Sequence, residues 1–381
     1  MKAVLFGAGS IGRGFIAELL TEAGLEVVFI DVNKVLIDAI NKQGCYRQVT
    51  VGSNYTKEKL INNVRAVDSS EIEKVSDEIC DCSLISTSVG ADVLQYIAPA
   101  IARGLTKRWD NGNHDPVNIL ICENLNNADK YLEREIISYL SEPHRFIFDK
   151  NVGLLETSIG RMIPVVTEEM SKEDPAAVYV EPYRYLPYDT ASVKGTMPDI
   201  PAAIPYTPFE YFTERKLFVH NMGHFLCALF GQIHEYKFIW EAISDPAIAF
   251  YVRSAMSYSA LALSKKHGIE YSDLLEHVDD LLYRFSNKAL ADTIERVLRD
   301  IPRKLSPADR LYGAVTLCEE QRVSPGYILL GIAAAHFLFT KEDNEDECVS
   351  RLHDAIHNGF AFGEIQEIIQ QYQSLNEKMI V

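Results

Sequence analysis

Short apolar runs alternate with stretches of helical periodicity in the first half of the chain. Each run is rich in β-branched residues and bounded by turn residues, as expected for strands buried on both faces. Strands that alternate with helices are typical of a parallel sheet covered by helices, so this half predicts an α/β domain. The predicted strands are 2–7, 25–31, 81–89 and 117–124, and the predicted helices begin near residue 11 and span 35–42.

The pattern changes in the second half of the chain. Tyr and Pro become frequent between about 150 and 205, and four prolines within 198–208 exclude a long helix there. From Tyr211 onward nearly the whole chain shows helical periodicity, interrupted by turn signals at 267–273 and 322–326. The chain therefore predicts two domains: an α/β domain over 1–200 and a mainly α-helical domain over 201–381.

Length and charge narrow the class of partner. The chain has 381 residues, 47% of them hydrophobic, which is enough to bury two cores. Its formal charge is −17, from 54 acidic and 37 basic residues. This balance argues against nucleic acid or an anionic membrane as the main partner and favours a small molecule. The acidic run at 342–347 is most simply a solvated loop.

The cysteines and the apolar runs predict the compartment. Seven cysteines are scattered without a C-x-x-C pair, so neither a zinc site nor a disulfide framework is indicated. The longest apolar run, 327–339, is too short to span a bilayer, and the chain reaches its first glycines too early for a secretory signal. We predict a soluble cytoplasmic protein with reduced thiols and no metal site; no motif indicates an oligomeric state.

A glycine motif joins the first predicted strand to the first helix. Gly7, Gly9 and Gly12 have the G-x-G-x-x-G spacing of a dinucleotide-binding fingerprint. In that fingerprint the glycines permit a tight turn, a close approach of the backbone to the pyrophosphate, and close helix packing. The helix that begins near Ile11 then offers unpaired N–H groups to the phosphates. We predict a Rossmann-type NAD site here; the alternative is a tight turn without a ligand.

An acidic residue ends the second predicted strand. Asp31 lies about twenty residues beyond the glycines, where a carboxylate accepts hydrogen bonds from the adenosine ribose. It would repel a 2′-phosphate, so NAD is favoured over NADP. The alternative is a helix cap or a turn carboxylate. Arg13, next to Gly12, either adds a charge to the pyrophosphate or is a surface arginine.

Two later strands end in small and polar residues. One predicted strand leads into Ser88, Val89 and Gly90, and the next leads into Glu123 and Asn124. Ligands of such sheets bind outside the carboxyl ends of the strands, so we predict that these residues meet the nicotinamide and its ribose. Ordinary turn chemistry is the alternative at each position.

Three polar residues share one side of the helix predicted after Tyr211. At about 100° per residue, Lys216, Asn221 and His224 fall at roughly 0°, 140° and 80°. A lysine in a partly apolar cleft has a lowered pKa and can act as a general base on an alcohol. Asn221 can donate to the reacting oxygen, and His224 can orient it. The alternative is a helix whose Lys and Asn face water and whose His is buried and satisfied.

Several segments together resemble one enzyme family, the polyol-specific long-chain (mannitol) dehydrogenases. The resemblance runs through both predicted domains, and its most specific mark is the K-x(4)-N-x(2)-H pattern. It implies a metal-independent, NAD(H)-dependent interconversion of D-mannitol 1-phosphate and D-fructose 6-phosphate. It also implies Lys216 as general base, with Asn221 and His224 on the reacting oxygen. The matching segments are MKAVLFGAGSIGRGFI, ICEN, KGTMPDIP, ERKLFVHNMGH and RKLSPADRL.

The chain departs from that family at three places. Gly160 stands where the family has an aspartate, next to a retained Arg161. Arg161 can pair with a carboxylate, shape an active cleft between the two domains, or form an interdomain salt bridge. His220 replaces a usually apolar residue and falls at about 40°, between Lys216 and His224, where it can retune the lysine or contact substrate. Lys288-Ala289 replaces a proline and an aromatic residue.

These departures leave other functions open. The same chemistry on another polyol or on a hexuronate is one alternative, and an NAD-binding regulator without turnover is another. For a substrate phosphate, the candidates are the local basic residues Arg303, Lys304 and Arg310. The alternative to a phosphate site is that these three residues are solvated charges at a helix boundary, because Ser306-Pro307 predicts the start of a helix.

Overall fold

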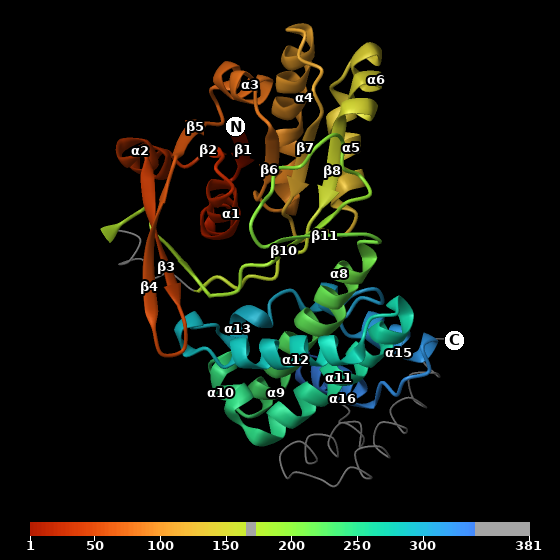
Figure 1. Ribbon diagram of the computed structural model, residues 1–381. Helices are drawn as coiled ribbons and strands as arrows, with labels where there is room; N and C mark the ends of the chain where they lie inside the picture. The colour runs from red at the N-terminus through yellow and green to blue at the C-terminus, as the bar shows by residue number, and fades with distance from the viewer. Residues whose placement is uncertain (165–172, 340–381) are drawn as a thin grey trace. The chain divides into compact units, whose positions relative to one another are not determined.

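The computed structural model describes residues 1–164 and 173–339, and Figure 1 labels its helices and strands. The chain divides into two compact units, the first ending at Glu210 and the second beginning at Tyr211. The first is built on a parallel sheet and the second is helical, so the predicted fold class is confirmed. The acidic run at 342–347 and Cys348 lie outside the described residues.

A six-stranded parallel sheet forms the centre of the first unit. Its strand order is β5-β2-β1-β6-β7-β8, so the chain moves outward from β1 to one edge and then returns to β6. Ligands of such sheets bind in the crevice where the order reverses, at the carboxyl ends of the strands. The strands are β1 (Lys2–Phe6), β2 (Glu26–Asp31), β5 (Val64–Asp68), β6 (Leu84–Thr87), β7 (Val117–Ile121) and β8 (Val152–Glu156).

Both faces of this sheet are covered, which explains why its strands are almost wholly apolar. Ala3 and Leu5 of β1 point into one core, and Val4 and Phe6 point into the other. The first core includes side chains of η1 (Gly12–Ile16), α1 (Ala17–Glu22) and α2 (Lys34–Gln43). The second includes side chains of α3 (Ile72–Cys80), α4 (Leu94–Asp110), α5 (Ala128–Ser138) and α6 (Glu142–Asn151), which lie together in Figure 1.

Two small sheets complete the first unit. In one, β3 pairs with β4 as an antiparallel hairpin and with β9 in parallel; in the other, β10 and β11 pair in parallel. The described part of the proline-rich stretch forms short strands and loops and no long helix, as predicted. These strands are β3 (Cys45–Val51), β4 (Thr56–Asn62), β9 (Val178–Val180), β10 (Leu186–Asp189) and β11 (Ala203–Tyr206).

The second unit packs around one helix. Ten of the twelve residues of α9 are buried, and it contacts α10, α11, α13 and α16. Within the described ranges, no helix is long and apolar enough to cross a membrane. The elements are α8 (Glu210–Arg215), η3 (Lys216–Asn221), α9 (Met222–Ile233), α10 (Ile239–Ser244), α11 (Pro246–His267), α12 (Tyr271–Phe285), η4 (Lys288–Leu290), α13 (Ile294–Val297), α14 (Ile301–Lys304), α15 (Tyr312–Glu320) and α16 (Gly326–Phe339).

Candidate functional site

The three glycines after β1 take the conformations that the fingerprint requires. Gly7 has a φ of +94°, and a Cβ on it would lie 2.4 Å from the carbonyl oxygen of Ser88. A Cβ on Gly12 would lie 2.1 Å from the carbonyl oxygen of Gly7. No described atom lies within 4 Å of a Cβ built on Gly9. The turn, the close helix packing and the open approach for a pyrophosphate are therefore all present.

Asp31 ties the glycine loop to the end of β2. Its Oδ2 accepts the N–H of Ala8 at 2.6 Å, and its Oδ1 accepts the N–H of Asn33 at 2.9 Å. The turn role considered for Asp31 is thus real, and Asn33 is the residue that caps α2. Asp31 nevertheless lines the cavity beside the loop, so it can meet a ligand as well.

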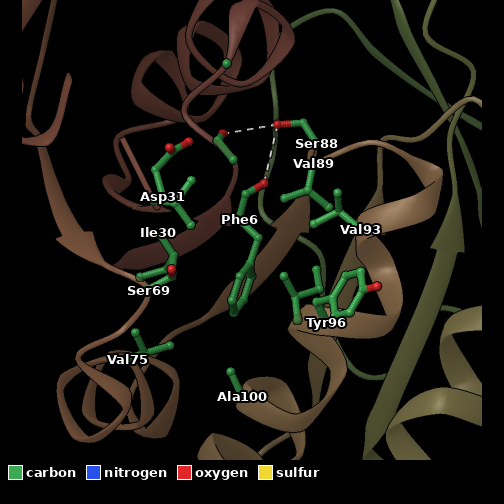
Figure 2. A pocket seen from close by; sticks show the side chains of 14 residues that line it. Phe6, Ile30, Asp31, Ser69, Val75, Ser88, Val89, Val93, Tyr96 and Ala100 are labelled. Atoms are coloured by element: carbon green, nitrogen blue, oxygen red, sulfur yellow. Dashed lines mark hydrogen bonds between the residues drawn. The ribbon is translucent and has the colours of Figure 1, made fainter. Parts of the chain in front are cut away.

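A cavity of about 370 Å³ lies along the carboxyl ends of the central strands. Figure 2 shows Asp31 and Ser88 toward one end of it and the apolar side chains of Phe6, Val75 and Ala100 toward the other. A carboxylate beside an apolar slot suits an adenosine group, whose ribose is polar and whose base is flat. Local patterns did not mark part of the lining, which comes from the residues after β2 and β5, from the residue before α4 and from α4 itself: Val32, Ser69, Val93, Tyr96 and Ile97.

Glu123 binds the loop after β6 rather than the cavity. Its two carboxylate oxygens accept the N–H groups of Val89 at 2.9 Å and of Gly90 at 2.8 Å. Burial raises the pKa of Glu123, although the two N–H donors act in the opposite direction. Ser88 donates to the carbonyl of Gly7 at 3.2 Å, so loop and glycine turn are joined. Asn124 directly follows this buried carboxylate.

Arg13 is not the surface arginine that was one of the two roles considered for it. The residue is buried, and its Nε donates to the carbonyl of Ala8 at 2.6 Å. Its Nη1 donates to the carbonyls of Ala176 and Ala177 at 2.5 and 3.0 Å. The guanidinium therefore connects the glycine loop to the segment before β9 and lies below the surface.

Arg161 belongs to a buried network within the first unit. Its Nη1 lies 2.6 Å from Oε2 of Glu18 and 2.7 Å from the carbonyl of Gly14, and its Nε and Nη2 donate to the carbonyl of Glu181. Pairing of Arg161 with a carboxylate was one of the predicted roles. Because its partner Glu18 lies in the same unit, the alternative of an interdomain salt bridge is wrong. Because all three nitrogens have protein partners, Arg161 is poorly suited to bind substrate.

The helix that carries the catalytic candidates is irregular. Lys216–Asn221 is a π-helix between α8 and α9, not the uniform α-helix assumed for the angular positions. A π-helix bonds residue i to residue i+5, so it brings Asn221 back toward the side of Lys216. Within this π-helix, the carbonyl of Phe218 accepts a hydrogen bond from the hydroxyl of Ser259 at 2.8 Å. Such single π turns are frequent at functional sites.

Lys216 has the acidity that a general base needs. The residue is half-buried, and burial, together with the charge of Arg310, lowers its pKa to about 8. Asn221 and His224 are also half-buried, so the alternative in which Lys216 and Asn221 project into water is not what the structure shows.

His224 has a carboxylate neighbour that the sequence did not reveal. Its Nε2 lies 2.9 Å from Oδ2 of Asp292, at an angle outside good hydrogen-bond geometry, and its ring stacks on Phe285 at 5.0 Å. Burial alone would raise the pKa of Asp292, but His224 and Arg296 lower it below the usual value. Asp292 follows His224 by 68 positions, and no local pattern marks it.

The predicted basic cluster separates into three different environments. Arg303 is exposed and pairs with Asp300 and Asp309. Lys304 is buried, and its ammonium donates to the carbonyls of Val297 and Arg299. Arg310 is buried, and its Nε lies 2.7 Å from Oδ1 of Asp309. Arg310 is thus the member whose charge reaches Lys216.

Ser306 and Pro307 do not begin a helix. They lie in a turn between α14 and α15, where the N–H of Asp309 donates to the carbonyl of Ser306 at 3.0 Å. The next helix starts at Tyr312. In the described part of the chain, no group of three or more His, Cys, Asp or Glu side chains is arranged to hold a metal ion.

The strand order, the glycine turn and the cavity beside Asp31 define a Rossmann-type dinucleotide-binding protein with a separate helical unit. Its sequence matches known domains along nearly the whole chain. Residues 1–202 match the mannitol dehydrogenase Rossmann domain, and residues 209–377 match the mannitol dehydrogenase C-terminal domain. The chain therefore belongs to the mannitol dehydrogenase family, a family of oxidoreductases.

Solved structures show the same fold at low sequence identity. Pseudomonas fluorescens mannitol 2-dehydrogenase, solved as a ternary complex with NAD and D-mannitol, is 16% identical, with a TM-score of 0.71 over 99% of this chain and 92% of that one. A D-sorbitol dehydrogenase in substrate-free form is 15% identical, with a TM-score of 0.76 over 99% and 93% of the two chains.

Proposed function

We propose that the protein is an NAD-dependent polyol phosphate dehydrogenase that interconverts D-mannitol 1-phosphate and D-fructose 6-phosphate, the reaction of a mannitol-1-phosphate 5-dehydrogenase. The observation that carries the proposal is Lys216, whose pKa is lowered to about 8 beside Asn221 and His224. A metal-independent oxidation of a secondary alcohol needs such a base and such donors. The membership of the family supports the reaction class.

The first unit supplies the cofactor site in this proposal. Gly7, Gly9 and Gly12 would hold the pyrophosphate, and Asp31 would accept the ribose hydroxyls, which favours NAD over NADP. When bound, NAD⁺ accepts the hydride from the alcohol carbon. The loop Ser88–Gly90, held by Glu123, would meet the ribose and ring at the nicotinamide end.

The second unit supplies the acid–base chemistry. In the oxidative direction, neutral Lys216 takes the proton of the hydroxyl whose carbon loses the hydride. The side-chain amide of Asn221 donates to the oxygen as it becomes a carbonyl, and His224, fixed by Asp292 and Phe285, orients the same oxygen. In the reductive direction, protonated Lys216 returns the proton to the alkoxide.

A second candidate keeps this chemistry and changes the substrate. The solved relatives are named for mannitol and sorbitol, which carry no phosphate. All three residues considered for a phosphate, Arg303, Lys304 and Arg310, are bound to protein groups. An unphosphorylated polyol or a hexuronate is therefore the alternative substrate, and an NAD-binding regulator without turnover is a further one.

An assay of NADH oxidation against a panel of sugars separates these functions. The panel contains D-fructose 6-phosphate, D-fructose, L-sorbose and two hexuronates, each at the same concentration with NADH and with NADPH. We expect the highest kcat/KM with fructose 6-phosphate and NADH. A higher kcat/KM with fructose or with a hexuronate would identify that sugar, and not fructose 6-phosphate, as the substrate. Tight NADH binding without oxidation by any sugar would support the regulator.

A further inference from the structure

Side chains hold the first peptide group of the glycine loop at both of its ends. This group joins Gly7 to Ala8. Its carbonyl accepts a hydrogen bond from the hydroxyl of Ser88 at 3.2 Å (Figure 2), and its N–H donates to Oδ2 of Asp31 at 2.6 Å. Because a peptide group is planar, these two bonds fix the direction in which it faces. The turn at Gly7 is therefore oriented by residues at or just after the ends of β2 and β6.

The next peptide group joins Ala8 to Gly9 and is held by Arg13. Its carbonyl accepts a buried hydrogen bond from Nε of Arg13 at 2.6 Å. The N–H of Gly9 lies on the opposite edge of the same trans peptide, so it points away from the guanidinium. No described residue accepts this N–H, and Gly9 is exposed and lines the cavity beside Asp31. A ligand of the cavity can therefore accept it.

A turn in the segment before β9 binds another nitrogen of the same guanidinium. The Nη1 atom of Arg13 lies 2.5 to 3.4 Å from three successive carbonyl oxygens, in Pro175–Ala177. The carboxylate of Asp174 accepts two N–H groups of this turn, each at 3.2 Å, and so keeps its carbonyls together. Arg13 is buried and bound through two of its nitrogens, so its guanidinium has little freedom to move. It therefore holds the carbonyl of Ala8 in one direction.

We propose that Arg13 is a positioning residue of the cofactor site, which holds the carbonyl of Ala8 and thereby directs the N–H of Gly9 to the pyrophosphate. The inference rests on the proposed function, in which the glycine loop binds the pyrophosphate of NAD. A hydrogen bond from a backbone N–H to a phosphate oxygen is charge-assisted and depends on direction. A peptide that already faces the ligand avoids the cost of being ordered during binding. Arg13 acts in this way without contacting the ligand.

The test compares two ligands that differ in the pyrophosphate: ADP-ribose carries it, and adenosine does not. Isothermal titration calorimetry gives the Kd of ADP-ribose for the full chain, and ligand-observed NMR gives the Kd of adenosine. We expect Arg13→Met to weaken ADP-ribose by at least about tenfold, as for a hydrogen bond to a charged group, and to leave adenosine within about twofold. Arg13→Lys keeps the charge and should lose nearly as much, because one ammonium does not reproduce the planar set of donors.

Arg108→Met is the matched control. Arg108 is also a buried arginine of the first unit, and its guanidinium donates to three backbone carbonyls near the amino ends of β6 and β7, those of Cys80, Cys82 and Asp115. Its replacement should lower thermal stability and leave the ratio of the two Kd values unchanged. A loss specific to ADP-ribose in Arg108→Met, equal losses of both ligands in Arg13→Met, or full affinity in Arg13→Lys would overturn the proposal.

A measurement on the wild type keeps the proposal testable even if the Arg13 variants do not fold. In protein prepared with isotope-labelled glycine, the amide proton of Gly9 should move downfield when ADP-ribose binds, because a charged oxygen then accepts it. Adenosine should shift it much less. A Gly9 resonance that responds equally to the two ligands would contradict the assigned role.

The outcomes also separate this role of Arg13 from the proposed function. If NADH and ADP-ribose bind but the Arg13 variants match the wild type, the positioning role is wrong and the function stands. If neither binds to the wild type, the cofactor site is wrong and the positioning role falls with it. If Arg13 acts as proposed but no sugar oxidises NADH, the positioning role stands and the enzymatic function is wrong.

Discussion

The Nε2 atom of His224 lies 2.9 Å from Oδ2 of Asp292, and the imidazole stacks on Phe285. A carboxylate beside a histidine selects the ring's tautomer and orientation. Asp292 also pairs with Arg296 at 2.6 Å, so its negative charge is held in place from two sides. His224 is thus fixed by a residue that does not itself need to contact substrate.

Replacing Asp292 with Asn should lower kcat by at least about tenfold, because the amide no longer favours the productive orientation of His224. The Kd of NADH should not change, since it depends on the first unit. Arg296→Met is the control, because it removes the other partner of Asp292 and leaves the contact with His224. Equal kcat losses in the two variants would show that Asp292 acts on stability rather than on His224.

Lys216→Ala should reduce turnover by about 10²–10⁴-fold while NADH still binds. In the wild type, the rate of alcohol oxidation should rise with pH and level off above about 8, because the base must be deprotonated. Ketone reduction needs the protonated lysine and should fall above the same pH. Lys304→Met is the control: the pKa of Lys304 is also lowered to about 8, mainly by burial, but its ammonium binds two backbone carbonyls. It should change thermal stability far more than turnover.

Arg310→Met should move both pH profiles to higher pH. The charge of Arg310 lowers the pKa of Lys216, so its removal raises that pKa and delays deprotonation of the base. The measurement is kcat against pH in both directions. Arg303→Met removes an exposed cation that is paired with Asp300 and Asp309, and its profiles should coincide with the wild type. A profile of Arg310→Met that does not move would contradict the assigned role.

Asp31→Asn should weaken NADH binding by about tenfold or more and should reduce the preference for NADH over NADPH. The carboxylate accepts the N–H of Ala8 and lines the cavity, and its charge would repel a 2′-phosphate. Fluorescence titration with both cofactors provides the measurement. Asp68 lies opposite Asp31 on the neighbouring strand and binds Ser70, so Asp68→Asn is the matched control and should leave both affinities unchanged.

Glu123→Gln should weaken NADH binding by about tenfold, because an amide NH₂ then faces one of the two N–H groups that the carboxylate accepts. Burial raises the pKa of Glu123, so wild-type NADH affinity should fall as the pH becomes acidic and the carboxylate is protonated. The variant should lack this dependence. Glu156→Gln is the control: Glu156, at the end of β8, accepts the N–H of Ala128, the first residue of α5, and this variant should retain the pH dependence.

Local patterns in the sequence determined the strands that line the crevice and the order of the two units. Apolar runs predicted β1, β2, β6 and β7 because buried parallel strands leave no polar positions. The tight turn at Gly7 and the close packing at Gly12 could be predicted from sequence, because only glycine tolerates the contacts made there. The hairpin of β3 and β4 was not predicted: its half-exposed residues gave no clear apolar alternation.

Only the tertiary structure decided which polar residues meet. Arg13 and Arg161 looked available in the sequence, yet they bind backbone carbonyls and Glu18 far along the chain, because a buried guanidinium requires acceptors. Asp292 gave no signal, since its relation to His224 arises only when α9 packs near the segment that carries it. Sequence supplied the polar side chains of Lys216, Asn221, His224 and His220; packing decided the pKa values of Lys216 and His220 and the carboxylate neighbour of His224, because burial and neighbouring charges depend on contacts between distant parts of the chain.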